Sequence, residues 1–263
     1  MLTIRHGQSL DNVKWVWAGW KDSPLSELAE LGQAFLKSNT NFDFIYTSDL
    51  LRAYATGQAV LDAQTRTPPF TSSQKLREQH FGIAEGHPWV IETPPNQPLE
   101  ELYKQGIFPV LPRDAKFPDG ESLEDVARRA EEALAEFVVP HLAADHDLHI
   151  AITSHGLFIS ELIAALLRLD PDSRRDISYA GLLNTAWTRA VVSVKVHLVD
   201  PLGTAPIDVD HLPPLTVNIK DVNNVDHLIS LEVERILYEL AAPETIDEEK
   251  SSAREFFGGK AMA

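Results

Sequence analysis

The stretch Leu2-Thr3-Ile4-Arg5-His6-Gly7 has a counterpart in the middle of the chain, His149-Ile150-Ala151-Ile152-Thr153-Ser154-His155-Gly156. In both, a short apolar run leads directly into a histidine and a glycine, which is typical of a buried strand that ends in a turn. Open α/β sheets place their chemistry at such strand ends, and the glycines would let a ligand approach the backbone. Either stretch alone would fit a turn with a surface histidine. The pair, with Arg5 directly before His6, favours an α/β fold with both histidines in one crevice.

A further strand with a polar end lies between the two histidines. Phe44-Ile45-Tyr46 is typical of a buried strand, Thr47-Ser48-Asp49 follows it, and a helix is predicted to open near Leu50. This places Arg52 in the first turn of that helix, where the helix dipole disfavours a cation. An anion bound beside Arg52 would explain its position. A solvent-facing arginine is the alternative interpretation of this segment.

The order of the motifs resembles the histidine phosphatase superfamily, in its phosphoglycerate mutase-like branch. The resemblance covers about the first 200 residues. It rests on Arg5-His6-Gly7-Gln8-Ser9 with Asn12, Gly19-Trp20 with Pro24-Leu25-Ser26, Thr47-Ser48 to Arg52-Ala53, Leu76-Arg77-Glu78 to Phe81-Gly82, Pro118-Asp119-Gly120-Glu121-Ser122, and Ser154-His155-Gly156. Several motifs in the family's order are far more specific than any one of them.

The resemblance implies a phosphoric monoester hydrolase of the histidine acid type. His6 would attack phosphorus through a neutral ring nitrogen and form a phosphohistidine. Glu78 would give a proton to the departing alkoxide and later take one from water. Arg5, Arg52 and His155, the last as a cation, would bind the phosphate and take the role that magnesium has in kinases. We therefore expect no metal and no cofactor.

The resemblance adds four substrate-binding positions, Asn12, Ala18, Gly19 and Gly156. Ala18 stands where many relatives carry a serine or threonine that touches substrate, so we expect one polar contact to be missing. The protonation demands of nucleophile and acid oppose each other, which predicts a bell-shaped pH profile with a neutral to mildly acidic optimum.

The expected fold is a three-layer α/β/α sandwich with a mostly parallel central sheet. The pattern predicts strands at 2–4, 44–47 and 149–153, helices near 27–37, 50–63, 121–138 and 157–167, and an antiparallel edge pair of 182–188 with 191–198. Residues 1–200 would form the catalytic domain, with a lid insert at about 83–119. Residues 201–263 would be an extension of loop plus a helix within 225–240, packed on the same domain or partly mobile.

The segment that follows Leu76-Arg77-Glu78 helps to distinguish a phosphatase from a mutase. By resemblance, a mutase carries a basic insert there, with paired arginines and lysines that bind a phosphoglycerate. Between residues 87 and 117 the only bases are Lys104, Arg113 and Lys116. Arg128-Arg129 falls in an amphipathic helix and is interpreted as part of a solvated face. The sequence therefore favours a phosphatase over the mutase.

Two alternatives to the phosphatase stay open. The first is a phosphoglycerate mutase that depends on a bisphosphorylated primer. The second is a phosphate-binding or scaffold protein without turnover, which has no need of both the nucleophile His6 and the acid Glu78.

Tryptophans predict the character of the substrate. Trp15, Trp17 and Trp20 follow the first motif, and Trp89 lies in the lid. They would form an aromatic wall for an apolar or planar part of the substrate, with ordinary core or rim packing as the alternative. His80 beside Glu78 is expected to pack rather than to tune the acid.

Composition limits the class of partner. The 263 residues are 44% hydrophobic, enough for one large α/β domain. The formal net charge is −16, from 23 basic and 39 acidic residues, which argues against nucleic acid or anionic membranes as partners. We expect a small phosphorylated substrate drawn to a local basic pocket, and a homodimer stays open.

The residue types and patterns that the sequence lacks also limit its chemistry and location. The chain has no cysteine, which excludes disulfides and thiol catalysis. No apolar run approaches the roughly 20 residues that span a bilayer, and Arg5 interrupts the N-terminal apolar stretch, so a cytoplasmic protein is expected. His141, His146 and His149 lie close in sequence, but their spacing does not favour a metal site.

Overall fold

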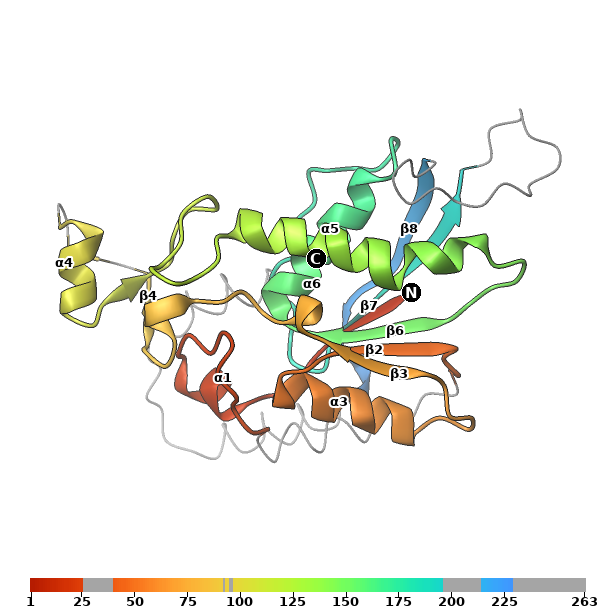
Figure 1. The fold of residues 1–263 in the computed structure, drawn as a ribbon, viewed down its shortest axis with the longest axis horizontal. Coiled ribbons are helices and arrows are strands. Elements are labelled where there is room, and N and C mark those ends of the chain that lie inside the picture. Colours follow the sequence, from red (N-terminus) through yellow and green to blue (C-terminus); the bar gives the residue numbers. More distant parts are fainter. Residues whose placement is uncertain (26–39, 92, 95–96, 196–213, 229–263) are drawn as a thin grey trace.

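The computed structural model describes residues 1–25, 40–91, 93–94, 97–195 and 214–228. Their centre is a six-stranded sheet in the order β3-β2-β6-β1-β7-β8 (Figure 1). The strands are β1 (Leu2–Arg5), β2 (Phe44–Ser48), β3 (Phe70–Ser73), β6 (Ile150–Ser154), β7 (Trp187–Val194) and β8 (Leu215–Asn224). The first four are parallel to one another, whereas β7 and β8 pair antiparallel. The sheet is therefore mostly parallel, as expected.

The pairing of β1 with β6 brings the two histidine motifs together. The strands run parallel with Arg5 opposite Ser154, so His6 and His155 leave the sheet at the same edge. β6 is buried along its whole length, which explains its run of apolar and small residues.

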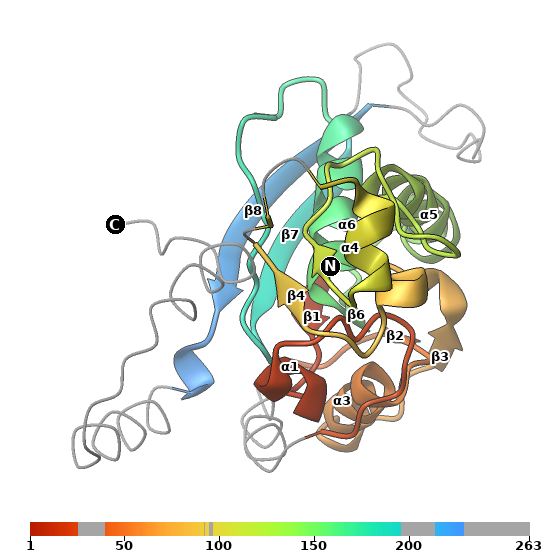
Figure 2. The same cartoon turned by 90° about the vertical axis from the view of Figure 1, so that its left-hand side faces the viewer.

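Helices cover both faces of the sheet. The longer ones are α3 (Leu51–Asp62), α5 (Leu123–Phe137) and α6 (Gly156–Arg168). Because side chains alternate along a strand, Ile150 and Ile152 of β6 face one side of the sheet and Ala151 the other. The isoleucines share a core with α5 and α6, whereas Ala151 shares a second core with Val60 of α3. The fold is thus a three-layer α/β/α sandwich, as expected (Figure 2).

Local sequence explains where the helices begin and how closely they pack. Ser122 caps α5 in a capping box with Asp125, and the buried positions of α5 recur at helical spacing. α3 lies close to the sheet because Gly57 has no side chain. A Cβ at Gly57 would stand 2.7 Å from Thr153 Oγ1 of β6. This close packing places the first turn of α3 at the ends of the parallel strands.

The predicted lid insert contains short elements. They are the 3-10 helix η2 (Gly82–Ala84), β4 (Trp89–Val90), α4 (Leu99–Lys104) and β5 (Phe108–Pro109), with β4 and β5 paired in a separate two-stranded sheet. Together with α1 (Leu10–Lys14), β4 and α4 lie at one end of the molecule (Figures 1 and 2). Trp17 and Phe108 belong to the small core of this end, so the lid and the loop after α1 pack as one unit.

The far edge of the sheet differs from the prediction. The expected pair of 182–188 with 191–198 is wrong: one strand, β7, covers 187–194, and its antiparallel partner is β8. β8 lies in the region that we expected to be loop and helix, so this part of the chain after residue 200 belongs to the main sheet. The alternation of Leu215, Val217 and Ile219 was the available signal, and the neighbouring prolines obscured it.

Other predictions are corrected or lie outside the described residues. Strand β3 was not predicted, because its sequence, Phe-Thr-Ser-Ser, carries little apolar signal. The helix near 27–37 and most of the one within 225–240 fall outside the described residues; residues 226–228 form a short 3-10 turn. None of the helices in the described part of the chain has the length and apolar content to cross a bilayer.

Candidate active site

His6 follows β1 directly and is almost fully buried. Its Nδ1 lies 2.5 Å from the carbonyl oxygen of Gly7, and because a carbonyl can only accept, Nδ1 carries the proton. Nε2 therefore presents a lone pair, and it accepts a hydrogen bond from Arg52 Nε at 3.3 Å. Burial, and then the charges of Arg52 and Arg5, hold the pKa of His6 well below its usual value. The ring is thus neutral near pH 7, with Nε2 free to act as a nucleophile.

Arg52 lies in the first turn of α3 and is buried, so the solvent-facing alternative is wrong. Its guanidinium donates to the carbonyl of Gly19 at 2.7 Å and to that of Lys21 at 2.9 Å. These bonds tie the loop after α1 to the end of β2. Burial lowers the pKa of Arg52, and the negative charges of Glu78 and Asp11 act in the opposite direction.

Arg5 supplies a second cation, which is partly buried. Its Nη1 donates to the carbonyl of Leu182, whereas its buried Nε has no hydrogen-bond partner among the described residues. Burial lowers the pKa of Arg5 to about 10, which still leaves it charged at neutral pH. A partly buried guanidinium with an unused N–H group is well suited to an anionic ligand.

His155 lies next to His6, with ring centroids 5.0 Å apart. Its Nε2 is 2.9 Å from Ser48 Oγ, whereas its buried Nδ1 has no partner in the described part of the chain. Burial, followed by the charge of Arg52, holds the pKa of His155 well below its usual value. The protein groups alone therefore favour a neutral His155, not the expected cation, because the ring is buried and lies near positive charge. A phosphate dianion would act in the opposite direction.

Glu78 projects its carboxylate toward the first turn of α6. Oε1 accepts from the backbone N–H of Phe158 at 3.1 Å, and Oε2 accepts from that of Leu157 at 3.3 Å. The N-terminus of a helix favours such contacts with a carboxylate. These bonds hold Glu78 beside the glycine that follows His155.

Arg129 holds the backbone that carries Glu78. Its guanidinium donates to the carbonyls of Arg77 at 2.6 Å and Glu78 at 3.0 Å, and it forms a bidentate pair with Glu121 at 3.0 and 2.7 Å. The Arg129 side chain is 13% exposed, so its interpretation as a solvated face is wrong. Arg128, at 66% exposure, does fit that interpretation, because adjacent helix positions point about 100° apart.

Two asparagines organise the loop after His6. Asn12 Oδ1 accepts from the backbone N–H of Ser9 at 3.0 Å and from Asn184 Nδ2 at 3.2 Å, which leaves the Asn12 amide nitrogen as the donor for a ligand. Asn184 Nδ2 also lies 3.2 Å from the carbonyl of His6. Asn184 is not predicted from the sequence, since a single asparagine before a strand is a weak signal.

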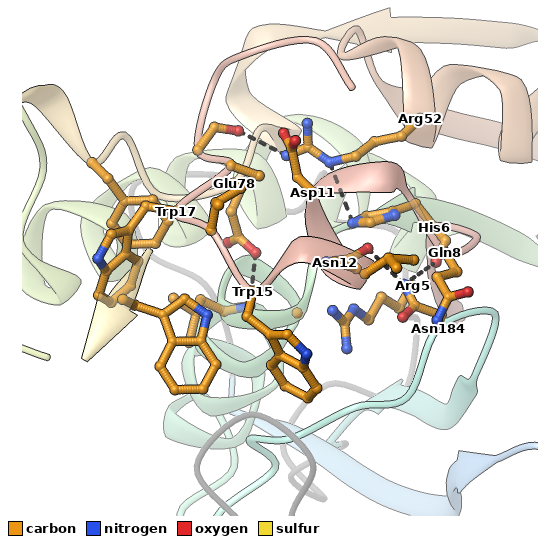
Figure 3. A pocket seen from close by; sticks show the side chains of 18 of the residues that line it. Arg5, His6, Gln8, Asp11, Asn12, Trp15, Trp17, Arg52, Glu78 and Asn184 are labelled. Carbon is orange, nitrogen blue, oxygen red and sulfur yellow. Dashed lines mark hydrogen bonds between the residues drawn. The ribbon is translucent and has the colours of Figure 1, made fainter. Parts of the chain in front are cut away.

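These groups surround a cavity of about 490 Å³ (Figure 3). Of the predicted site residues, the cavity is lined by Arg5, His6, Asn12, Ala18, Gly19, Arg52, Glu78 and Gly156. His155 is not on its wall: it is fully buried behind His6. The structure thus brings all nine predicted residues to one end of the sheet.

The outer wall of the cavity is aromatic. Trp15, Trp17 and Trp89 line it, and the rings of Trp15 and Trp89 meet edge to face with centroids 5.6 Å apart. Trp20 lies off the cavity wall, and its Nε1 donates to the carbonyl of Glu78 at 2.8 Å. Trp15 and Trp89 thus form the more exposed part of this wall, whereas Trp17 is 4% exposed and donates to the carbonyl of Phe108 within the lid core. For Trp17 and Trp20 the packing alternative therefore holds.

The three bases of the lid are engaged in ion pairs away from the cavity. Arg113 pairs with the buried Glu161 at 2.5 Å, and Lys104 and Lys116 pair with other carboxylates at 2.7 and 3.3 Å. Among the described residues that line the cavity, Arg5 and Arg52 are the only lysines or arginines.

The remaining histidines serve local roles. His141, His146 and His149 each contact a different neighbour, respectively Tyr46, Asp145 and Asn41. In the ranges that the structure describes, no group of three or more histidine or acidic side chains is placed to hold a metal. His80 packs against Trp20, with its Nδ1 2.6 Å from the carbonyl of Asp119.

Comparisons with known proteins agree with this geometry. A family model described as histidine phosphatase superfamily (branch 1) matches residues 1–196. The chain is 29% identical to the 2,3-bisphosphoglycerate-dependent phosphoglycerate mutase 2 of Lactobacillus johnsonii, over 76% of this chain and 94% of the relative. It is 31% identical to a phosphoglycerate mutase of Schizosaccharomyces pombe, over 65% and 81% respectively.

A solved structure is similar as well. It is a mycobacterial glucosyl-3-phosphoglycerate phosphatase complexed with VO3, 26% identical to this chain. The match covers 84% of this chain and 97% of that chain, with a TM-score of 0.60. Phosphatases and mutases therefore both occur among the relatives.

The buried Arg52 and the partly buried Arg5 together predict anion binding. We expect isothermal titration calorimetry to detect binding of inorganic phosphate to the protein. Arg5→Gln should weaken this binding about ten- to a hundredfold, because a charge-assisted hydrogen bond contributes about 1.5–3 kcal/mol. Arg128→Gln, which removes the same charge from an exposed position, is the control. Equal binding by both variants, with both folded by circular dichroism, would exclude Arg5 from the anion site.

Proposed function

The chain belongs to branch 1 of the histidine phosphatase superfamily, and we propose that it is a metal-independent phosphatase that hydrolyses a phosphate monoester through a phosphohistidine on His6. The observation that carries this proposal is the neutral His6 Nε2 held at 3.3 Å from the guanidinium of the buried Arg52. A nucleophile with its lone pair beside a fixed cation meets both needs of phosphoryl transfer, in-line attack and charge stabilisation.

The first half-reaction follows from these positions. A phosphate oxygen between Arg5 and Arg52 would place phosphorus in front of His6 Nε2. As the N–P bond forms, the ester P–O bond breaks, and the leaving oxygen takes a proton from Glu78. Arg5, Arg52 and the Asn12 amide would stabilise the equatorial oxygens.

The second half-reaction returns the enzyme to its starting state. Glu78, now a carboxylate, would take a proton from water, which attacks phosphorus while the P–N bond breaks. The products are inorganic phosphate and a neutral His6. The groups of the chain supply the charge stabilisation, so the proposal includes no metal.

The charges around the cavity support hydrolysis over mutase activity. A mutase has to bind an ester that carries a second anionic group, and this needs further cations. The lid bases are paired with carboxylates elsewhere, and the cavity wall described above carries the acids Asp11 and Glu78 against Arg5 and Arg52. The mutase remains the alternative because the curated relatives bear that name.

The proposal is tested by a panel of phosphate monoesters assayed with EDTA present. We expect phosphate release that survives EDTA and vanishes in His6→Ala. The panel includes 3-phosphoglycerate with and without bisphosphoglycerate. Isomerisation of phosphoglycerate without phosphate release would establish the mutase. No reaction with any ester would indicate a phosphate-binding scaffold.

The pH dependence of kcat/KM is expected to be bell-shaped. The pKa of His6 is lowered, so His6 is already neutral at pH values where an ordinary histidine of pKa 6.5 is protonated, and the acid limb should lie well below that value. Because the leaving oxygen needs a proton, the rate should also fall toward alkaline pH. A rate measured from about pH 4 to about pH 9 that rises steadily throughout would exclude Glu78 as the acid.

Arg129 is predicted to position the acid. Arg129→Lys keeps the charge but loses the fork that holds the Glu78 backbone, so kcat should fall about tenfold or more for alkyl phosphates, whose poor leaving group needs a proton. The loss should be much smaller for p-nitrophenyl phosphate, because its leaving group, p-nitrophenolate, departs without a proton. Arg128→Lys is the control. Equal losses on both ester types would indicate a general structural role.

A further inference from the structure

Asp11 is a charged residue of the cavity wall that the proposed reaction does not use. It lies in α1, between the nucleophile loop and the tryptophans, and its carboxylate lies near Arg52 in the close view (Figure 3). Within the described part of the chain, the Asp11 carboxylate has no hydrogen-bond or ion-pair partner. The cap of α1 does not require it either, because Ser9 and Asn12 form the capping box.

With phosphate bound, the negative charges that line the cavity exceed the positive ones by the charge of Asp11. Arg5 and Arg52 carry two positive charges, and His6 is neutral. A phosphate dianion offsets both arginines, and Glu78 must hold a proton when the ester bond breaks. With the phosphate bound, the Asp11 carboxylate is then an uncompensated negative charge inside the cavity.

Among the described residues that line the cavity, a second negative charge on the substrate would meet no cation beyond Arg5 and Arg52. The lid bases are held in ion pairs off the cavity wall, and the Arg113–Glu161 pair is partly buried. The wall next to the phosphate consists instead of side chains such as Trp15, Trp89 and Leu157. Like charges in a partly desolvated pocket repel strongly, because the effective dielectric constant there is well below that of water.

We propose that Asp11 is a specificity-determining residue, which excludes esters with a second anionic group and so restricts the substrate to phosphate monoesters of uncharged alcohols with a planar or apolar portion. This inference rests on the proposed function. Specificity then has two sources, repulsion of esters with a second anionic group and apolar contact with esters of uncharged alcohols. The carboxylate repels phosphorylated acids, and the tryptophans take up the flat part of the alcohol.

The test compares two esters that differ by one carboxylate, phenyl phosphate and 4-carboxyphenyl phosphate. For the wild-type protein we expect kcat/KM to be at least about tenfold higher for phenyl phosphate. Asp11→Asn has nearly the same shape without the charge, and it should reduce this selectivity ratio about tenfold. Asp11→Glu, which keeps the charge, should retain most of it. Asp62→Asn, which removes a carboxylate from the exposed far end of α3, should leave the ratio unchanged.

The outcomes separate this inference from the proposed function. Equal turnover of the two esters by the wild-type protein would overturn the role of Asp11 without any variant. An unchanged ratio in Asp11→Asn would do the same, provided that phenyl phosphate is still hydrolysed in a His6-dependent manner. Asp11→Ser is a second neutral variant should the first not fold. If the wild-type protein releases phosphate from neither ester and isomerises 3-phosphoglycerate, both the proposed function and the restriction to uncharged alcohols fail.

Discussion

The guanidinium groups of the buried Arg52 and the partly buried Arg5, beside a neutral histidine, are the constraint around which the rest of this structure is arranged. Burying a cation costs several kcal/mol unless hydrogen bonds replace its water. The chain meets that cost with backbone carbonyls: those of Gly19 and Lys21 accept from Arg52, and that of Leu182 accepts from Arg5. Each bond ties a loop to the end of a parallel strand. Burial, together with the charges of the two arginines, keeps His6 neutral, so one arrangement both holds the loops and prepares the proposed nucleophile.

The proposed acid, Glu78, is held by a separate set of contacts. Glu78 belongs to neither of the strands that present the histidines, and its backbone is bonded by Arg129 and Trp20 while its carboxylate contacts the start of α6. α5 and α6 pack on the same face of the sheet, which fixes these groups relative to His155. The position of the acid therefore depends on helix packing, and the position of the nucleophile depends on strand pairing.

The cavity combines a basic floor with an aromatic and acidic wall. With a formal charge of −16, the surface as a whole repels anions, so the arginines must attract phosphate locally. The lid bases, which lie off the cavity wall, are likewise paired with nearby carboxylates. Charge thus limits the substrate as much as shape does, and a single phosphate is the anion that the described residues can balance.

The sequence by itself determined the strands that carry His6 and His155, the helix that carries Arg52, and the set of residues at the site. These features rest on local apolar periodicity and on motifs in a known order, which a sequence contains directly. Tertiary structure alone decided the pairing of β7 with β8, the use of Arg129 behind Glu78, the part played by Asn184, and the neutral state of His155. Each of these depends on groups far apart in the chain and on burial. No local pattern encodes which distant side chain will lie beside a charge, or how much water the fold will remove from it.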